Sequence, residues 1–196
     1  MRFYRSDIAD VSDELAAAYE EVFTAPPWSE EPGASKEFTD RLAVDRLRPG
    51  FRAVVAPSPA GVDGFVTGWI TQAPFPHGRS YDKVAAQLGP HTRQLVVGAY
   101  EINEVAVRPG ARRTGLGGRL LAAAVEAAAP DGRAWLLTAR FATDTVNFYR
   151  RRGWHEITPP PGADSGAGSI AVFLAPDHPE VPAHRELFTR STGINR

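Results

Sequence analysis

Cysteine is absent from the 196-residue sequence. Its absence excludes disulfide bridges, thiolate metal ligands and a cysteine nucleophile, and it leaves the redox compartment unreadable from the composition. The five histidines show none of the H-E-x-x-H-type spacings that mark a metalloenzyme. We therefore expect no bound metal and no chemistry that passes through an enzyme thiolate.

Long apolar runs and a strong net charge are also missing. No apolar run approaches the roughly 18 residues that cross a membrane, and the first residues, MRFYRSDIADVSDE, lack the apolar segment of a signal peptide. The formal net charge of -1 argues against a general nucleic-acid binder, although it leaves room for a local basic pocket. These absences predict a cytoplasmic protein with no membrane or nucleic-acid partner.

The length and composition that remain are typical of one globular domain with a sizeable core. Apolar residues at helical spacing predict a first helix over about 11–23, with Asp10 or Ser12 as its cap, and a second over about 35–47. The remaining elements are predicted in this order along the chain: strands within 51–56, 64–73 and 94–107, a helix carrying Leu120 to Ala128, a strand at 134–139, a helix at 143–153, and strands at 154–158 and 169–175.

This order predicts a single α/β (α+β) domain over residues 1–175. Its sheet should be mixed, mostly antiparallel and twisted, flanked by helices, with a strand–helix–strand unit at the centre and an added first strand in 2–6. Residues 74–93 are polar and irregular, with room for one short helix. Residues 176–196 show no periodicity, so we expect a poorly ordered tail.

The stretch RPGARRTGLGGRLLAAAVEAAA, from Arg108 to Ala129, carries the clearest functional signal. The first turn of a helix has backbone N–H groups without partners and a partial positive charge, which together suit a phosphate. The glycines of the stretch leave room for close approach, and Arg112 and Arg113 add full positive charge. The stretch therefore predicts a cradle for a diphosphate.

Two phosphate-binding patterns fit this stretch poorly. A P-loop requires a lysine where the chain has Leu116, and a dinucleotide fingerprint requires a third glycine where it has Leu120. The pattern V-x-P-x-x-R-x-x-G-x-G does fit, from Val107 to Gly117, and FYRRRGW follows at 148–154. Together these motifs resemble the GNAT superfamily of acetyl-CoA-dependent N-acetyltransferases. One departure is Ala142, where many members carry an asparagine.

The resemblance implies a GNAT-type fold that binds acetyl-CoA as the acetyl donor. The CoA diphosphate would lie on the glycine loop, and the pantetheine arm would pair with a strand edge that splayed neighbouring strands leave exposed. The implied cofactor residues are Val105, Ala106, Val107, Arg112, Arg113, Thr114, Gly115, Leu116, Gly117 and Gly118. A plain helix entry for the glycines and a solvated surface position for Arg112 are the alternatives.

The resemblance also implies catalytic roles. Tyr149 is the candidate general acid for the departing thiolate, with a merely packed tyrosine as the alternative. Glu104 is the first candidate for the base and Glu101 the second. Because they are three residues apart on one strand, they should face opposite sides of the sheet. A structural glutamate, or an amine that loses its proton to bulk water, remains open.

The acceptor is predicted to be a small-molecule or peptide primary amine. Trp28, in PPWSEE, and Tyr81 are the candidate acceptor contacts, together with His77, Arg79 and His91. A core tryptophan and an insertion without a role are the alternatives. We predict direct attack in a ternary complex. A non-catalytic CoA-binding sensor, transfer of a longer acyl group, and a homodimer of this chain also remain open.

Overall fold

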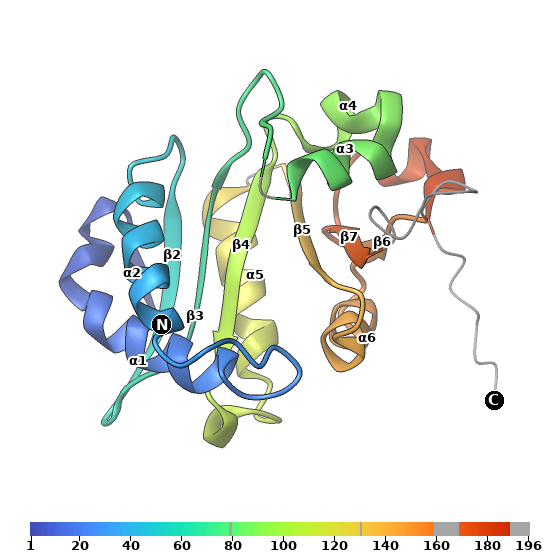
Figure 1. The fold of residues 1–196 in the computed structure, drawn as a ribbon. Helices are drawn as coiled ribbons and strands as arrows, with labels where there is room; N and C mark the ends of the chain where they lie inside the picture. Colours follow the sequence, from blue (N-terminus) through green and yellow to red (C-terminus); the bar gives the residue numbers. More distant parts are fainter. Residues whose placement is uncertain (79, 130, 159–168, 189–196) are drawn as a thin grey trace, which may run out of the picture.

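Seven strands form one sheet in the computed structural model, which describes residues 1–78, 80–129, 131–158 and 169–188. The strand order is β1-β2-β3-β4-β5-β7-β6, and every neighbouring pair is antiparallel except β4 and β5 (Figure 1). The strands are β1 (Arg2–Tyr4), β2 (Arg52–Ser58), β3 (Gly61–Ile70), β4 (Tyr100–Val107), β5 (Ala134–Ala139), β6 (His155–Glu156) and β7 (Ile170–Leu174). The predicted mixed sheet with a central strand–helix–strand unit is confirmed.

Helices cover both faces of this sheet (Figure 1). They are α1 (Ser12–Phe23), α2 (Ala34–Asp45), α3 (Tyr81–Leu88), α4 (Thr92–Val96), α5 (Leu116–Ala128) and α6 (Thr143–Arg151). Helices α1 and α2 pack on one face of β2 and β3, while α5 packs on the other. Helices α3 and α4 share a separate core with β5 and β7. No helix in the described ranges combines the length and the apolar character needed to cross a bilayer.

The start of α1 differs from the prediction. Neither Asp10 nor Ser12 caps the helix, because Val11 is the N-cap residue and no side chain bonds to the first turn. A 3-10 turn over Ser6–Val11 instead runs directly into the helix, and its Ala9 carbonyl accepts the Ser12 N–H. The preceding turn thus supplies the acceptor that a capping side chain would otherwise provide.

The polar stretch 74–93 contains more regular structure than predicted. Helix α3 lies inside it and α4 begins at its end, and β4 follows at Tyr100, within the predicted range 94–107. Both helices turn apolar side chains onto Trp135 of β5, among them Val84 and Leu95. A tertiary contact of this kind stabilises helices that are too short to form alone.

The described part of the predicted tail contacts the domain. His178 is buried, its Nε2 lies 2.9 Å from the Leu95 carbonyl, and its Nδ1 accepts the N–H of Glu180 at 3.3 Å. Phe188 forms an isolated bridge with Ile157. These contacts hold residues 176–188 against α4 and β6. Residues 159–168 and the last residues, 189–196, lie outside the described ranges.

A β-bulge interrupts the ladder between β3 and β4. Thr67 pairs with Glu104 and Gly68 pairs with Ile102, which leaves Asn103 as an extra residue on β4. Gly68 lies so close to β4 that a Cβ there would collide with the Glu101 carbonyl oxygen and lie 2.7 Å from Tyr100 Cζ. The bulge shifts the alternation of side chains along β4 by one residue.

We expect Gly68→Ala to destabilise the fold by about 1–3 kcal/mol, because the added methyl group meets the backbone of β4. Gly110→Ala is the matched control, since nothing lies within 4 Å of a Cβ there. Its effect should stay within about 0.5 kcal/mol. Urea unfolding of both variants measures the difference, and equal stabilities would contradict the close approach at the bulge.

We expect the buried His178 to make stability fall with acidity. Burial lowers the pKa of His178 from 6.5 to about 4. The unfolded chain therefore binds this proton first, so stability is complete above pH 6.5 and declines as the pH falls toward 4. Wild type should lose about 2–3 kcal/mol more than His178→Gln between pH 7 and pH 4.5 in urea unfolding. An equal fall in the free energy of unfolding of both proteins would contradict this role of His178.

Candidate active site

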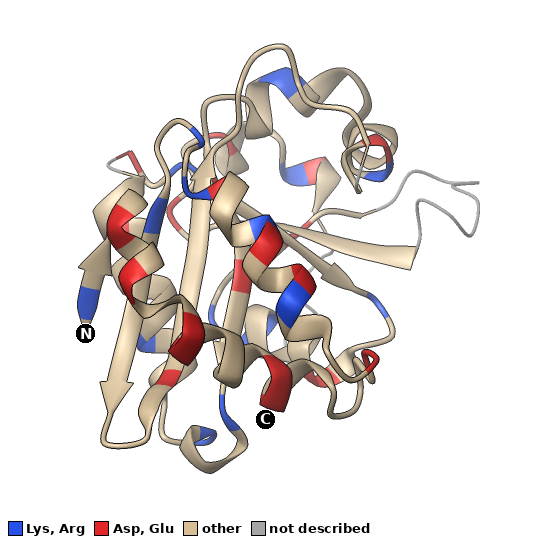
Figure 2. Ribbon diagram, turned by 60° about the vertical axis from the view of Figure 1, so that its left-hand side comes forward, with Lys and Arg blue, Asp and Glu red and all other residues tan. Residues whose placement is uncertain are grey.

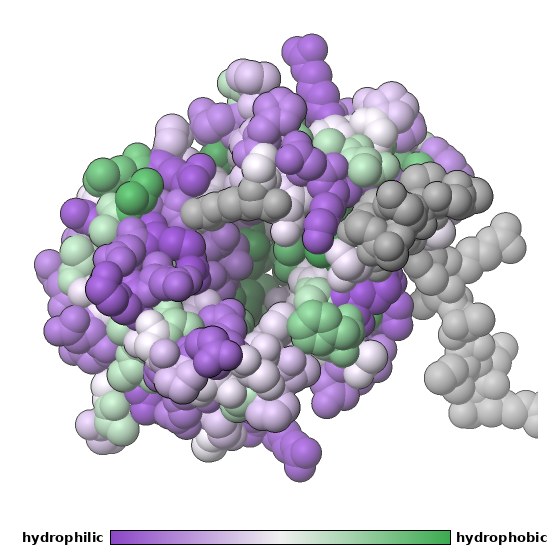
Figure 3. Space-filling model, viewed as in Figure 1, coloured by the Kyte–Doolittle hydropathy of each residue, from purple (hydrophilic) through white to green (hydrophobic). Residues whose placement is uncertain are grey.

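A cavity of about 1320 Å³ opens where β4 and β5 separate. The two strands pair only from Tyr100 with Ala134 to Ile102 with Leu136, and beyond that point they diverge (Figure 1). The space-filling view shows a hollow at the centre of this face (Figure 3). Small-molecule sites typically measure about 300–1,000 Å³, so this cavity has room for two ligands in contact.

The diverging part of β4 presents an unpaired edge to this cavity. The Arg108 N–H donates to the Asp63 carbonyl of the neighbouring strand β3 at 2.9 Å. Because backbone groups alternate along a strand, those of Val107 and Val105 point the opposite way, toward the cavity. The splayed strands that the resemblance implied are therefore present, and an extended ligand with amide groups could pair with this edge.

The N-terminal end of α5 lies at one end of the cavity. Two residues before the helix have positive φ, Arg113 at 63° and the N-cap Gly115 at 79°. Among the described residues, no hydrogen-bond acceptor is found for the N–H groups of 113–118. Successive free N–H groups of this kind form a concave anion site, and the helix dipole adds to it.

Four arginines line this end of the cavity: Arg112, Arg113, Arg151 and Arg152. Arg112 Nε donates to the Val107 carbonyl at 3.1 Å, which fixes the guanidinium beside the open strand edge. Arg151 and Arg152 were not predicted, although the run of three arginines in FYRRRGW was a visible signal. The first of that run, Arg150, pairs instead with Glu156, Nε to Oε2, at 2.6 Å.

Most of the predicted cofactor residues line the cavity: Val105, Val107, Arg112, Arg113, Gly115, Leu116 and Gly117. Three others do not. The side chain of Ala106 is buried under α1, the Thr114 hydroxyl donates to the Ala111 carbonyl, and a Cβ on Gly118 would collide with the Arg152 guanidinium. Gly117 has a packing role as well, because a Cβ there would lie 3.3 Å from Phe148 of α6.

The prediction that Glu101 and Glu104 face opposite sides of the sheet was wrong. The bulge at Asn103 shifts the alternation, and the two glutamates pair with Trp69 and Thr67 of β3, which lie two residues apart on one face. Both glutamates therefore line the same cavity. The sequence does not signal this bulge, because nothing in the residues around Asn103 interrupts the pattern typical of a regular strand.

The two carboxylates differ in their surroundings. Glu101 is buried and accepts bonds from the Tyr81 hydroxyl at 2.9 Å to each oxygen and from Thr71 at 3.4 Å. The side chain of Glu104 is 17% exposed, and its Oε1 lies 3.8 Å from Arg41 Nη2. Glu104 is thus the glutamate that a ligand in the cavity can reach, while Glu101 is enclosed by protein donors.

A chain of polar contacts continues from Glu104 along the α1 side of the cavity. Arg41 donates to the Tyr19 hydroxyl at 3.0 Å, and that hydroxyl donates to Glu30 at 3.0 Å. Burial, followed by the negative charges of Glu104 and Glu30, raises the pKa of Tyr19. Tyr19 therefore stays a neutral donor, and Arg41 compensates part of the carboxylate charge on this wall.

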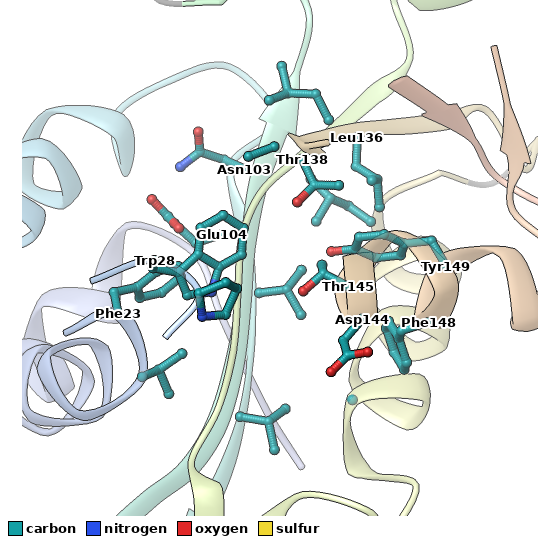
Figure 4. Close-up of a pocket in the computed structure, with 18 of the residues that line it drawn as sticks. Phe23, Trp28, Asn103, Glu104, Leu136, Thr138, Asp144, Thr145, Phe148 and Tyr149 are labelled. Carbon is teal, nitrogen blue, oxygen red and sulfur yellow. The ribbon is translucent and has the colours of Figure 1, made fainter. Parts of the chain in front are cut away.

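Tyr149 lies across the cavity from Glu104. Its ring is buried among Phe148, Trp154 and Phe173, and its hydroxyl points from α6 toward β4 (Figure 4). Among the described residues the hydroxyl has no hydrogen-bond partner. Burial, and then the charge of Glu104, raises the pKa of Tyr149. The phenol is therefore held protonated with its donor group directed into the cavity.

The predicted acceptor residues are divided between the cavity and other places. Trp28 and Tyr81 line the cavity, but the Tyr81 hydroxyl is committed to Glu101. His77 is exposed and pairs with Asp82, whereas His91 stacks against His184. Arg79 lies outside the described residues. Four polar lining residues were not predicted and surround Tyr149 and Glu104 in Figure 4: Asn103, Thr138, Asp144 and Thr145.

No group of three or more candidate metal ligands occurs in the part of the chain that the structure describes. The departure at Ala142 lies at the start of α6, where this buried residue is the N-cap. Its methyl group can form no hydrogen bond to a ligand. Backbone N–H groups and arginines remain as the donors for an anionic ligand.

Comparisons with known proteins agree with this geometry. The family model for the acetyltransferase (GNAT) domain matches residues 78–156. No curated protein shows significant sequence similarity to the chain. Among solved structures, a GNAT-family protein from Desulfovibrio desulfuricans is 20% identical, with 88% of this chain and 96% of that chain covered and a TM-score of 0.57.

Two further structures share the fold. PaiA N-acetyltransferase from Thermoplasma acidophilum, solved with coenzyme A, is 14% identical, with 89% of this chain and 99% of that chain covered and a TM-score of 0.56. Ribosomal-protein-alanine N-acetyltransferase from Brucella melitensis is 20% identical, with 88% and 96% covered and a TM-score of 0.54. At these identities the likeness shows the fold.

We expect Tyr149 to remain a phenol across the whole neutral and mildly alkaline range. Its raised pKa means that the folded protein resists ionisation here, so this contribution to stability is complete below pH 10 and is lost above it. The ultraviolet absorbance of phenolate should therefore be the same in wild type and Tyr149→Phe up to about pH 10. Additional phenolate signal in wild type below that pH would contradict the expectation.

Proposed function

We propose that this chain transfers an acetyl group from acetyl-CoA to a primary amine. The matched acetyltransferase (GNAT) domain and the shared fold support this proposal. The attack would be direct, within a ternary complex. The observation that carries the proposal is one cavity lined by the start of α5, the open edge of β4, Glu104 and Tyr149.

The residues present suit the donor. The N–H groups of 113–118 and the guanidinium of Arg112 would hold its diphosphate, and the edge at Val105 and Val107 would pair with its pantetheine amides. In this arrangement the thioester would lie near the bulge, within reach of Glu104 and Tyr149. A backbone N–H of β4 that points into the cavity could polarise the thioester carbonyl there.

The reaction then needs two proton movements. Glu104 would take a proton from the attacking amine, directly or through a water, and Tyr149 would donate to the departing thiolate. Glu104 is the more exposed of the two glutamates, and Tyr149 is held protonated, as a proton donor must be. Holding amine and thioester together would supply much of the remaining acceleration.

The charges that line the cavity favour a cationic acceptor on one side. Glu30, Glu101 and Glu104 lie together with Arg41, whereas Arg112, Arg113, Arg151 and Arg152 lie before α5 and at the end of α6. Helix α1 carries, outside the lining, Asp13, Glu14, Glu20 and Glu21 and no lysine or arginine (Figure 2). This distribution would favour an ammonium near the carboxylates and a phosphate near the four arginines. A small-molecule amine and a peptide amine both fit this description.

A non-catalytic CoA-binding domain is the second candidate. The departure at Ala142 and the pairing of Glu104 with Arg41 favour it, because both reduce the groups available for chemistry. This candidate keeps the diphosphate cradle and requires neither a base nor an acid. Binding and turnover must therefore be measured separately.

We expect Arg112→Ala to weaken CoA binding about tenfold or more, since a charged hydrogen-bond donor beside the diphosphate is lost. Isothermal titration with CoA measures the loss. Arg93→Ala, which removes an exposed arginine of α4 outside the cavity, is the control and should bind as wild type. Unchanged affinity in Arg112→Ala would argue against the cradle.

The double variant Glu104→Gln with Tyr149→Phe should keep CoA binding and lose turnover about 100-fold or more. Acetyl-CoA consumption across a broad panel of amines provides the measurement. Tight CoA binding by wild type without acetylation of any amine would instead favour the non-catalytic domain.

A further inference from the structure

Phe141 is exposed to an unusual degree for its size. Its side chain is 64% exposed, although it stands between Ala139 and Asp144, both of which line the cavity. The turn that carries it is firmly held. The Arg140 N–H donates to the Ser169 carbonyl at 2.9 Å, and the Arg140 guanidinium donates to the buried Glu156 at 2.8 Å. The ring is therefore kept at the rim of the cavity by the structure around it.

Trp28 meets this ring from the other half of the sheet. It follows α1 in the chain and packs on Phe23, with ring centroids 5.6 Å apart. Its ring lies 6.1 Å from that of Phe141 at an interplanar angle of 66°. We call Trp28 and Phe141 the aromatic clamp. Trp28 lines the cavity, whereas Phe141 lies outside its lining.

The two residues of the clamp come from different parts of the fold, because Trp28 follows α1 and Phe141 precedes α6. Of the five large apolar side chains that are exposed in the described part of the chain, Phe141 alone has a ring contact with a residue that lines the cavity. Isolated exposed apolar residues are ordinary. Trp28 lines the cavity, and its contact with the exposed Phe141 extends an aromatic surface from the cavity wall to the solvent, against which a flat apolar group could pack.

The charges below the clamp suit one ammonium group rather than several. Three carboxylates line the acceptor side, and each already has a protein partner. Glu101 accepts from Tyr81, Glu30 accepts from Tyr19, and Glu104 lies beside Arg41. The positive charge of Arg41 in the middle of this wall opposes a second cation. Glu104 remains the partly exposed carboxylate of this wall.

We propose that the acceptor is an arylalkylamine, a primary amine joined to an aromatic ring by a short chain. This inference rests on the proposed function. The ring would lie against Trp28 and Phe141, and the nitrogen would reach Glu104 at the thioester. The clamp thus selects the acceptor, and it takes no part in binding the donor.

The test compares three amines with acetyl-CoA: 2-phenylethylamine, 2-cyclohexylethylamine and cadaverine. The first two have the same carbon skeleton, and only the first is flat, whereas cadaverine carries two ammonium groups. Wild type should show kcat/KM about tenfold higher for 2-phenylethylamine than for either of the others. Phe141→Leu and Trp28→Leu should each remove most of this preference and leave the KM for acetyl-CoA unchanged.

Phe3→Leu is the control, because Phe3 is an exposed aromatic residue on β1 outside the cavity. It should keep the wild-type preference. The proposal is overturned if cadaverine is the better acceptor, if the two ring amines react equally, or if Phe141→Leu lowers all three equally. Titration of wild type with CoA shows which of the two proposals has failed. If CoA binds tightly but no arylalkylamine is acetylated, only the proposed acceptor class is overturned. If CoA does not bind, the proposed function is overturned as well.

Discussion

The separation of β4 from β5 beyond Ile102 is the constraint on which the site depends. Three residue pairs hold the two strands together, and after them each strand follows its own half of the sheet. Had the ladder continued, the backbone groups of Val105 and Val107 would be satisfied within the sheet and no cavity would exist. Because it stops, the edge of β4, the start of α5 and the side chains of α6 face one common space. The binding surface therefore exists because the ladder between β4 and β5 stops after three residue pairs.

The bulge at Asn103 gives this space its chemistry. One extra residue in β4 moves Glu104 to the face that already carries Glu101, and Gly68 on β3 provides the room for the irregular backbone. The two glutamates have different environments. Glu101 accepts hydrogen bonds from Tyr81 and Thr71, and Glu104 is partly exposed beside Arg41. A local irregularity of the backbone has thus produced one structural carboxylate and one accessible carboxylate from residues three positions apart.

Much of the fold was predictable from the sequence, because long periodic segments and strong turn residues determine it locally. The strand at 134–139 and the helix that Gly153 ends are such segments. The loop before α5 was predictable for the same reason, since its glycines and arginines are adjacent in the chain. The sequence was insufficient where distant contacts decide. An inserted residue reverses the expected direction of Glu101 relative to Glu104, which made that prediction wrong. Helix α4, which packs in one core with Trp135, and the contact of Phe141 with Trp28 across 113 positions of chain (141 − 28) were not predicted.

Glu156 has a consequence for where the proposed acid is held. Its carboxylate accepts from Arg140 just before α6 and from Arg150 near the end of that helix, so both ends of α6 are bonded to β6. Tyr149, next to Arg150 in the chain, is thereby fixed relative to β6. Glu104 is positioned separately, by the pairing of β4 with β3. The spacing between the proposed acid and base is therefore set by two different halves of one sheet.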